Sequence, residues 1–118
     1  MTGLTTHVLD IALGVPAKGV MIDVFRIQEE VREYLRTVRT NADGRIDGGP
    51  ILSGETFRKG TYELVFHTGA YLKFTGQKLP DVLFLDIIPI RFGVSDPNLH
   101  YHVPLLLSPF GYSTYRGS

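Results

Sequence analysis

Short apolar segments alternate with turn-forming residues along the whole chain. Segments rich in Val, Ile, Leu, Phe, Tyr and Thr lie between stretches that carry Gly and Pro, such as GVPAKG, NADGRIDGGP and SDPN. Inward and outward positions alternate most clearly at 61–66 and 100–103, a spacing typical of strands with one buried face. Short strands separated by turns in this way indicate an all-β sandwich or barrel. The pattern predicts strands at 4–10, 19–27, 31–40, 60–68, 82–94, 100–107 and 111–116, with a short eighth strand at 53–57.

Two segments allow more than one interpretation. Residues 28–36 are good helix formers, so propensity alone favours a helix there. Period-two spacing also fits, because it places Val31 and Leu35 on one face, and we expect a strand. Residues 69–77 lack strict alternation, which predicts one short helix between strands.

Two prolines lie inside predicted strands. Proline has no N–H to donate to a sheet ladder, so Pro89 predicts an edge strand or a bulge, and Pro104 indicates the same for the next strand. No internal repeat or linker interrupts the pattern. We therefore expect a single domain over 1–118.

Composition narrows the classes of function. The chain has 118 residues, with 12 basic and 12 acidic side chains and no cysteine. A neutral balance argues against a nucleic-acid partner and a polybasic membrane anchor. The absence of cysteine excludes disulfides, thiolate metal sites and a cysteine nucleophile. No secretory signal or bilayer-spanning run is visible, so we expect a cytoplasmic protein, and no nucleotide-binding motif appears.

The histidines are the first candidates for chemistry. On a strand, His100 and His102 share one face, which suits two metal ligands or one functional histidine with a neighbour. A metal site needs a third ligand, such as His7 or Asp96. Purely structural histidines remain the alternative for each of them, and His7 in particular fits a core histidine with one hydrogen-bond partner as well as a catalyst. His67, before Thr-Gly, is predicted to be a turn or surface residue.

Two further features stand out. Arg45 follows the turn sequence Asn-Ala-Asp-Gly and is either solvated or able to hold a carboxylate or polarised carbonyl through its guanidinium fork. The C-terminal segment 108–118 stays aromatic and β-prone, whereas chain ends are usually polar and frayed. It is therefore expected to dock as a strand, on its own sheet or against a neighbouring subunit.

Three motifs give the sequence a resemblance to the 5-hydroxyisourate hydrolases, the enzyme branch of the transthyretin-like family. They are LTTHVLD followed by GVPAKGV, the NADGR turn, and HYHVPLLLSPFGYSTYRGS. The closing YRGS is the signature of the enzymes, and the hormone-carrying transthyretins lack it and the matching histidines. The resemblance covers essentially the whole chain. A transthyretin-type carrier of a small ligand is the alternative function.

The resemblance implies a β-sandwich of two four-stranded sheets with one short helix, here 69–77. It also implies that two chains pair edge to edge through their last strands, and that two such dimers form a homotetramer. The active sites would lie in the cleft between the dimers, with 111–118 at that interface.

The implied reaction is the cofactor-free hydrolysis of 5-hydroxyisourate to 2-oxo-4-hydroxy-4-carboxy-5-ureidoimidazoline. Water attacks a ring carbonyl and a C–N bond breaks. Histidine, with a pKa near 6.5, suits water activation, and His102 is our candidate for the base. His100 is left as a neighbour. The family's functional positions match catalytic His7, Arg45, His102 and Ser118, with His7, Arg45, Tyr115 and Arg116 contacting substrate; Ser118 would offer its hydroxyl or a terminal carboxylate.

Overall fold

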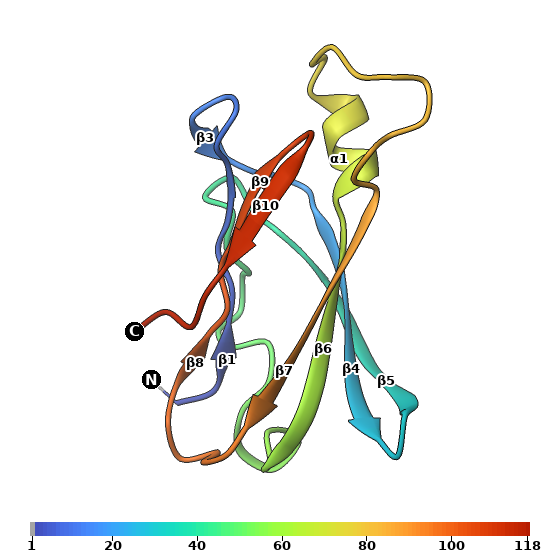
Figure 1. Ribbon diagram of the computed structural model, residues 1–118. Helices are drawn as coiled ribbons and strands as arrows, with labels where there is room; N and C mark the ends of the chain where they lie inside the picture. The colour runs from blue at the N-terminus through green and yellow to red at the C-terminus, as the bar shows by residue number, and fades with distance from the viewer. Residues whose placement is uncertain (1) are drawn as a thin grey trace.

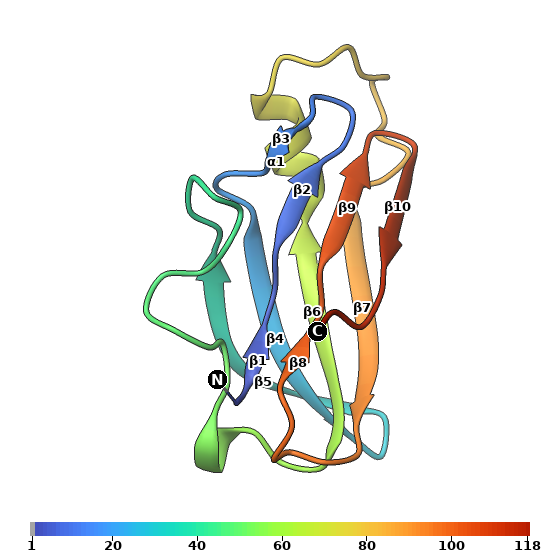
Figure 2. The same ribbon diagram turned by 90° about the vertical axis from the view of Figure 1, so that its left-hand side faces the viewer.

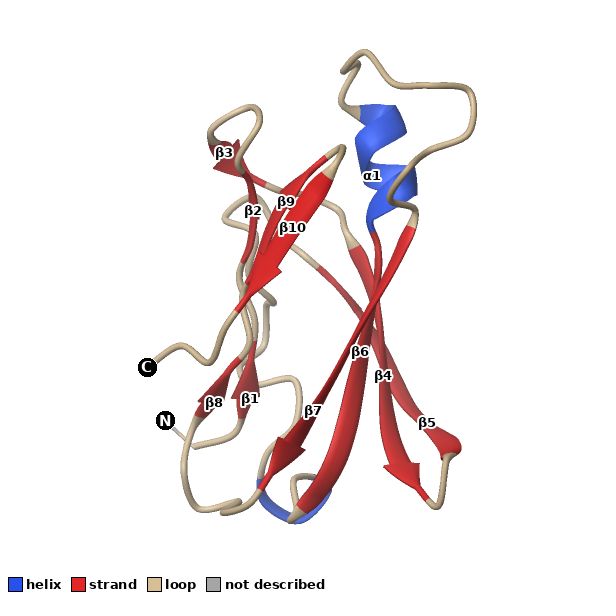
Figure 3. Cartoon of the chain, in the orientation of Figure 1, coloured by secondary structure: helices blue, strands red, loops and turns tan. Residues whose placement is uncertain are grey.

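The computed structural model describes residues 2–118 and consists of two β layers packed face to face (Figure 1). One layer is an antiparallel sheet in which each strand is hydrogen-bonded to its neighbour in the order β5-β4-β6-β7. Figure 3 shows that strands dominate and that the α-helix sits at one end of the sandwich. The strands of this sheet are β4 (Met21–Gln28), β5 (Val31–Arg39), β6 (Gly60–His67) and β7 (Ile87–Val94).

The second layer carries both ends of the described chain (Figure 2). Its order is β10-β9-β2-β3, and the pair β1-β8 continues β2 and β9. The ladder is unbroken in hydrogen bonding, because Val103 N donates to Thr5 O and Leu105 N donates to His7 O, at 2.9 and 3.0 Å. The strands are β1 (Leu4–Thr5), β2 (Val8–Asp10), β3 (Val15–Pro16), β8 (Tyr101–His102), β9 (Leu105–Ser108) and β10 (Gly111–Thr114). The predicted sandwich is thereby confirmed.

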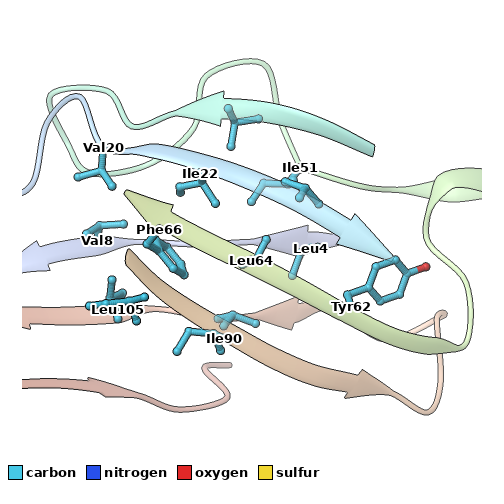
Figure 4. Close-up of a cluster of buried hydrophobic side chains, with 14 of the residues drawn as sticks. Leu4, Val8, Val20, Ile22, Ile51, Tyr62, Leu64, Phe66, Ile90 and Leu105 are labelled. Carbon is cyan, nitrogen blue, oxygen red and sulfur yellow. The ribbon is translucent and has the colours of Figure 1, made fainter. Parts of the chain in front are cut away.

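The core lies between the two layers, and Figure 4 shows its side chains pointing toward one another. Leu4, Val8 and Leu105 come from one sheet, and Ile22 and Leu64 from the other; all five are fully buried. A buried Leu or Val side chain stabilises the fold by about 1.5–3 kcal/mol relative to exposure. Burial alternates along β2, β7 and β9, so the residues between the buried positions of these strands face outward, whereas the central strand β6 is buried at every position from Tyr62 to Phe66.

The β4–β5 hairpin settles the ambiguous segment in favour of strand. Gln28 pairs with Val31 across a two-residue turn, and both turn residues, Glu29 and Glu30, have positive φ, 49° and 67°. This conformation suits Asn-Gly and is unfavourable for Glu. Packing of β4 and β5 outweighs both turn strain and helix propensity.

Several predicted boundaries are wrong. Residues 54–56 form a 3-10 helix, η1 (Gly54–Thr56), rather than a strand. Its turn is closed by Thr56, whose hydroxyl accepts from Ser53 N and donates to Ser53 O, an alternative to sheet pairing. The strand predicted at 82–94 begins only at Ile87, because the preceding loop is held against the helix by Asp86 O, which accepts from the Thr68 hydroxyl and Gly69 N.

The other elements agree more closely. Pro89 lies on β7, an edge strand, as predicted. Pro104 separates β8 from β9, and β3 was not anticipated. The short helix is α1 (Thr68–Phe74). Among residues 2–118, no helix has the length and apolar character needed to cross a bilayer.

Buried Asp10 ties α1 to the second layer. One carboxylate oxygen accepts from the Tyr71 hydroxyl at 2.8 Å and from the Gln77 amide at 3.1 Å, and the other accepts from backbone N–H groups of the β2–β3 turn. Burial and this carboxylate raise the pKa of Tyr71, which therefore stays protonated as a donor. The Asp of the LTTHVLD motif is thus a structural anchor.

Candidate active site

The candidate site lies on the face of the second layer that points away from the core. Leu4, Thr6 and Val8 are buried, whereas Thr5 and His7 between them are partly exposed on the outer face. The parallel pairing of β1 with β8 sets Thr5 opposite His102. The alternation of the LTTHVLD motif therefore points Thr5 and His7 outward, beside the strand that carries His102.

Arg45 is brought to this face by the NADGR turn. The Asn41 side-chain oxygen accepts from Asp43 N and Arg45 N, at 2.9 and 3.1 Å, which closes the turn. Gly44 has φ of +75°, and β2 runs so close to it that a Cβ there would collide with Val8 O. Val8 N donates to Gly44 O at 2.8 Å and fixes the turn to the sheet. The exposed Arg45 side chain has no carboxylate partner among residues 2–118 and is free to hold an anionic or polarised group.

These elements enclose an open pocket of about 410 Å³. That volume is within the usual range for small-molecule sites, roughly 300–1,000 Å³. Its lining combines imidazole, guanidinium and hydroxyl groups with apolar walls. The lining residues are Thr5, Thr6, Arg45, Ile46, Gly49, Ile51, His100, His102 and Ser118.

His102 is held from three sides. Its Nδ1 lies 2.8 Å from Thr5 Oγ1, and its ring is nearly parallel to that of His100, with centroids 6.5 Å apart. Gly117 N donates to His102 O at 2.7 Å. Burial, then electrostatic contributions from Arg45, His100 and His7, lower the pKa of His102 below 6.5, so the imidazole is neutral at pH 7.

The tail divides between two places. Ser118 lines the pocket, and Gly117 packs on the His102 ring so closely that a Cβ would lie 2.5 Å from Cδ2. Tyr115 and Arg116 instead line a second groove of about 240 Å³ between β7 and β10. Arg116 stacks 4.1 Å over the Tyr101 ring and donates to His100 O at 3.4 Å. Within one chain, the structure therefore brings Ser118 to the histidines and leaves Tyr115 apart from them.

His7 is a partly exposed residue at the rim, not a core histidine. Its Nε2 lies 2.9 Å from Asp43 O in the same turn that carries Arg45. It does not line the pocket itself, yet it contributes to the lowered pKa of His102. The turn thus positions two of the expected residues together.

His67 lies away from the pocket, and the candidate metal ligands are not gathered in one place. His67 is on the other sheet, where Nε2 lies 2.8 Å from an Asp23 carboxylate oxygen. Asp96 is in the loop before β8, where it accepts from Asn98 N. Among residues 2–118, no group of three or more His, Cys, Asp or Glu side chains is arranged to hold a metal ion. The expected third ligand is not supplied by either His7 or Asp96.

Sequence reasoning assigned no site role to Thr5 or to the apolar walls. The signal for Thr5 was available in its alternation with His7, but its contact with both histidines depends on the β1–β8 register. Ile46 and Ile51 carry no signal, because apolar residues beside a turn are ordinary.

Comparison with known proteins shows the family to which the chain belongs. The family model described as HIUase/Transthyretin family matches residues 4–117. The chain belongs to the HIUase/Transthyretin family. A curated relative, 5-hydroxyisourate hydrolase 2 of Rhizobium meliloti (strain 1021), is 61% identical over 115 residues, which cover 98% of this chain and 95% of the relative.

Two solved structures show which fold the chain shares. The crystal structure of (S)-allantoin synthase superimposes with a TM-score of 0.93 at 46% identity over 98% of this chain, which spans 43% of that longer chain. Sea bream transthyretin in complex with thyroxine superimposes with a TM-score of 0.85 at 28% identity, over 97% of this chain and 93% of that one. The shared fold is therefore transthyretin-like.

Proposed function

We propose that this protein is a hydrolase that opens the ring of 5-hydroxyisourate with water, in urate catabolism. The full-length similarity to proteins named 5-hydroxyisourate hydrolase supports the substrate. The observation that carries the chemistry is the pocket in which His102, Arg45 and Ser118 face one open space. A carrier of the transthyretin type needs no such set of ionisable groups, and this alternative is less supported.

The roles follow from residue chemistry. A neutral imidazole accepts a proton from water as the water oxygen bonds to the ring carbonyl carbon. Arg45 meets the negative charge that develops on the carbonyl oxygen, as fixed donors do in acyl transfer. When the C–N bond breaks, the leaving ring nitrogen takes the proton back from the imidazolium. His7 and His102 are the two candidates for base and hydrogen-bond donor, and the Ser118 hydroxyl orients substrate or water.

In the single chain, Tyr115 and Arg116 lie outside the pocket that His102 lines. Tyr115 is well exposed beside β10, an edge strand. If a second copy pairs with that edge, as the family resemblance implies, Tyr115 and Arg116 contribute to substrate binding or to the interface. Exposed Ile11, Leu13 and Phe110 on the same layer support burial of this face in a homotetramer. Light scattering should return the mass of four chains.

The direct test is an ultraviolet time course. Urate oxidase generates 5-hydroxyisourate in the cuvette, and the protein should accelerate loss of its absorbance in proportion to the amount added. Replacement His102→Asn, which removes the imidazole but keeps a polar side chain, should nearly abolish this acceleration. Arg45→Lys should lower kcat, since a point charge replaces the two-pronged guanidinium. Decay at the spontaneous rate with the parent protein would contradict the proposed activity.

Cellular location is part of the same proposal. The chain contains no cysteine, which fits a reducing compartment, and we propose the cytoplasm. Fractionation of the native host with an antibody to the protein tests this.

A further inference from the structure

The Thr5 hydroxyl sits between two imidazole rings. Its oxygen lies 2.9 Å from His100 Nε2 and 2.8 Å from His102 Nδ1. A hydroxyl has one proton to donate and lone pairs that accept. The position of the proton on one ring therefore decides its position on the other.

The second ring nitrogen of His100, Nδ1, determines the direction of the hydrogen bonds that run from His100 through Thr5 to His102. His100 Nδ1 is buried and has no hydrogen-bond partner among residues 2–118. A buried N–H without a partner is destabilising, and such orphaned N–H groups are rarer than orphaned acceptors. We therefore assign the proton of neutral His100 to Nε2, which donates it to Thr5 Oγ1.

The tautomer of His102 follows from the hydrogen bonds of the Thr5 hydroxyl. Thr5 accepts from His100, so its own proton is free to go to His102 Nδ1. If both rings donated to Thr5, its proton would lack an acceptor, since no third partner of this hydroxyl occurs among residues 2–118. Neutral His102 then carries its proton on Nε2.

We propose that Thr5, backed by His100, is a positioning residue that holds His102 in the Nε2–H tautomer, so that His102 offers the substrate a hydrogen-bond donor. This deepens the proposed hydrolase function and rests on it. In this proposal His102 is a hydrogen-bond donor and not the base that we expected from the sequence. A neutral imidazole is an effective donor to a carbonyl oxygen that gains negative charge.

His7 has the complementary arrangement. Its Nε2 faces Asp43 O, and a carbonyl oxygen only accepts, so Nε2 carries the proton. The lone pair of neutral His7 is therefore on Nδ1, and from the rim of the pocket this atom is the candidate acceptor for the proton of the attacking water. The same proton passes to the leaving ring nitrogen when the C–N bond breaks, and His7 returns to its starting form. His7 and His102 therefore differ in role because their hydrogen-bond partners differ.

The tautomer itself is measured by NMR of protein labelled with ¹⁵N in its histidine rings. The parent at neutral pH should show His102 with Nδ1 unprotonated and Nε2 protonated. Thr5→Val removes the hydroxyl while keeping the shape, and should give His102 a mixture of tautomers. Thr5→Ser keeps the hydroxyl and should restore the parental pattern. A parental His102 protonated on Nδ1 would overturn the proposal without any variant.

Kinetics provides the second readout. Thr5→Val should lower kcat for 5-hydroxyisourate about 10–100-fold with little change in KM, as loss of an orienting partner typically does. Thr5→Ser should stay within about threefold, and Thr37→Val, a matched control on the opposite sheet, should match the parent. Parental kcat in a folded Thr5→Val protein would refute the positioning role. If the parent does not accelerate 5-hydroxyisourate decay, the proposed function fails, whereas the NMR result still judges the tautomer.

Discussion

The closest packing in the site involves Gly117 and the ring of His102, and it predicts the effect of a single methyl group. A Cβ at Gly117 would lie 2.5 Å from His102 Cδ2, 3.2 Å from Cγ and 3.3 Å from Cβ. Carbon atoms pack best at about 3.5–4.0 Å, so the Gly117→Ala methyl demands a displacement of about 1 Å. The backbone of Gly117 has an ordinary φ, so the expected effect comes from this contact and not from the turn.

Two groups are able to move. If the His102 ring moves, its Nδ1 leaves the 2.8 Å contact with Thr5 and the ring is misplaced in the pocket. If the tail moves instead, the 2.7 Å bond from Gly117 N to His102 O breaks and Ser118 leaves the pocket. Misplacement of a catalytic group by about 1 Å costs on the order of 100-fold in rate, so Gly117→Ala should lower kcat by about that factor.

Global stability should change much less. Most side chains after Thr114 are exposed, and the loss of one hydrogen bond costs about 1 kcal/mol. The assay therefore pairs the 5-hydroxyisourate time course with urea unfolding. Gly111→Ala is the matched control in the same tail, because its Cβ would find only Ser108 Oγ at 3.8 Å. Gly117→Ala activity within threefold of Gly111→Ala would refute the reasoning.

Two further predictions concern the sheet remote from the site. Replacement of Glu29 and Glu30 by Asn-Gly relieves two positive φ angles that cost about 1–2 kcal/mol each, so the free energy of unfolding should rise by at least about 1 kcal/mol in urea titrations; an unchanged midpoint would contradict this. The Thr37 hydroxyl and then His67 hold the pKa of Asp23 below 3.8, so this carboxylate stabilises the fold above pH 3.8 and the contribution is lost as pH falls through the lower folded value. Asp23→Asn should therefore destabilise at pH 7 and show a smaller difference from the parent under strong acid; an equal difference at both pH values would contradict the assignment.

The fold was predictable wherever residues alternate over a full strand. The strands β4, β5 and β6 were each expected from the sequence, and β5 forms a strand although it is rich in helix formers, because the hairpin pairs it with β4. The prediction of a strand at 53–57 failed because the Thr56 hydroxyl bonds locally to the backbone. The prediction also failed before Ile87, where a loop bonded to the helix replaces the first residues of the expected strand. Both failures come from side-chain to backbone bonds that hydrophobic periodicity does not record.

The candidate site was predictable in part, for a related reason. The NADGR sequence predicts a turn, and the structure shows that this turn carries Arg45 to the sheet beside His7. The division of the tail was not predictable, because beyond Thr114 the chain leaves regular pairing and only the bridge of Gly117 to His102 decides which side chains face the pocket. The link through Thr5 needs the register of two strands that are far apart in sequence.

Period-two spacing also explains how one scaffold supports different activities. Leu4 and Val8 belong to the core, whereas the outward-facing Thr5 and His7 lie in or beside the candidate site. A change on the outer face removes little buried apolar area, so it leaves the sandwich intact while altering its chemistry. Sea bream transthyretin, solved with thyroxine, retains the fold at 28% identity. The difference between binding a ligand and opening a ring should therefore reside in the few outward groups that set proton positions around His102, and not in the strands that carry them.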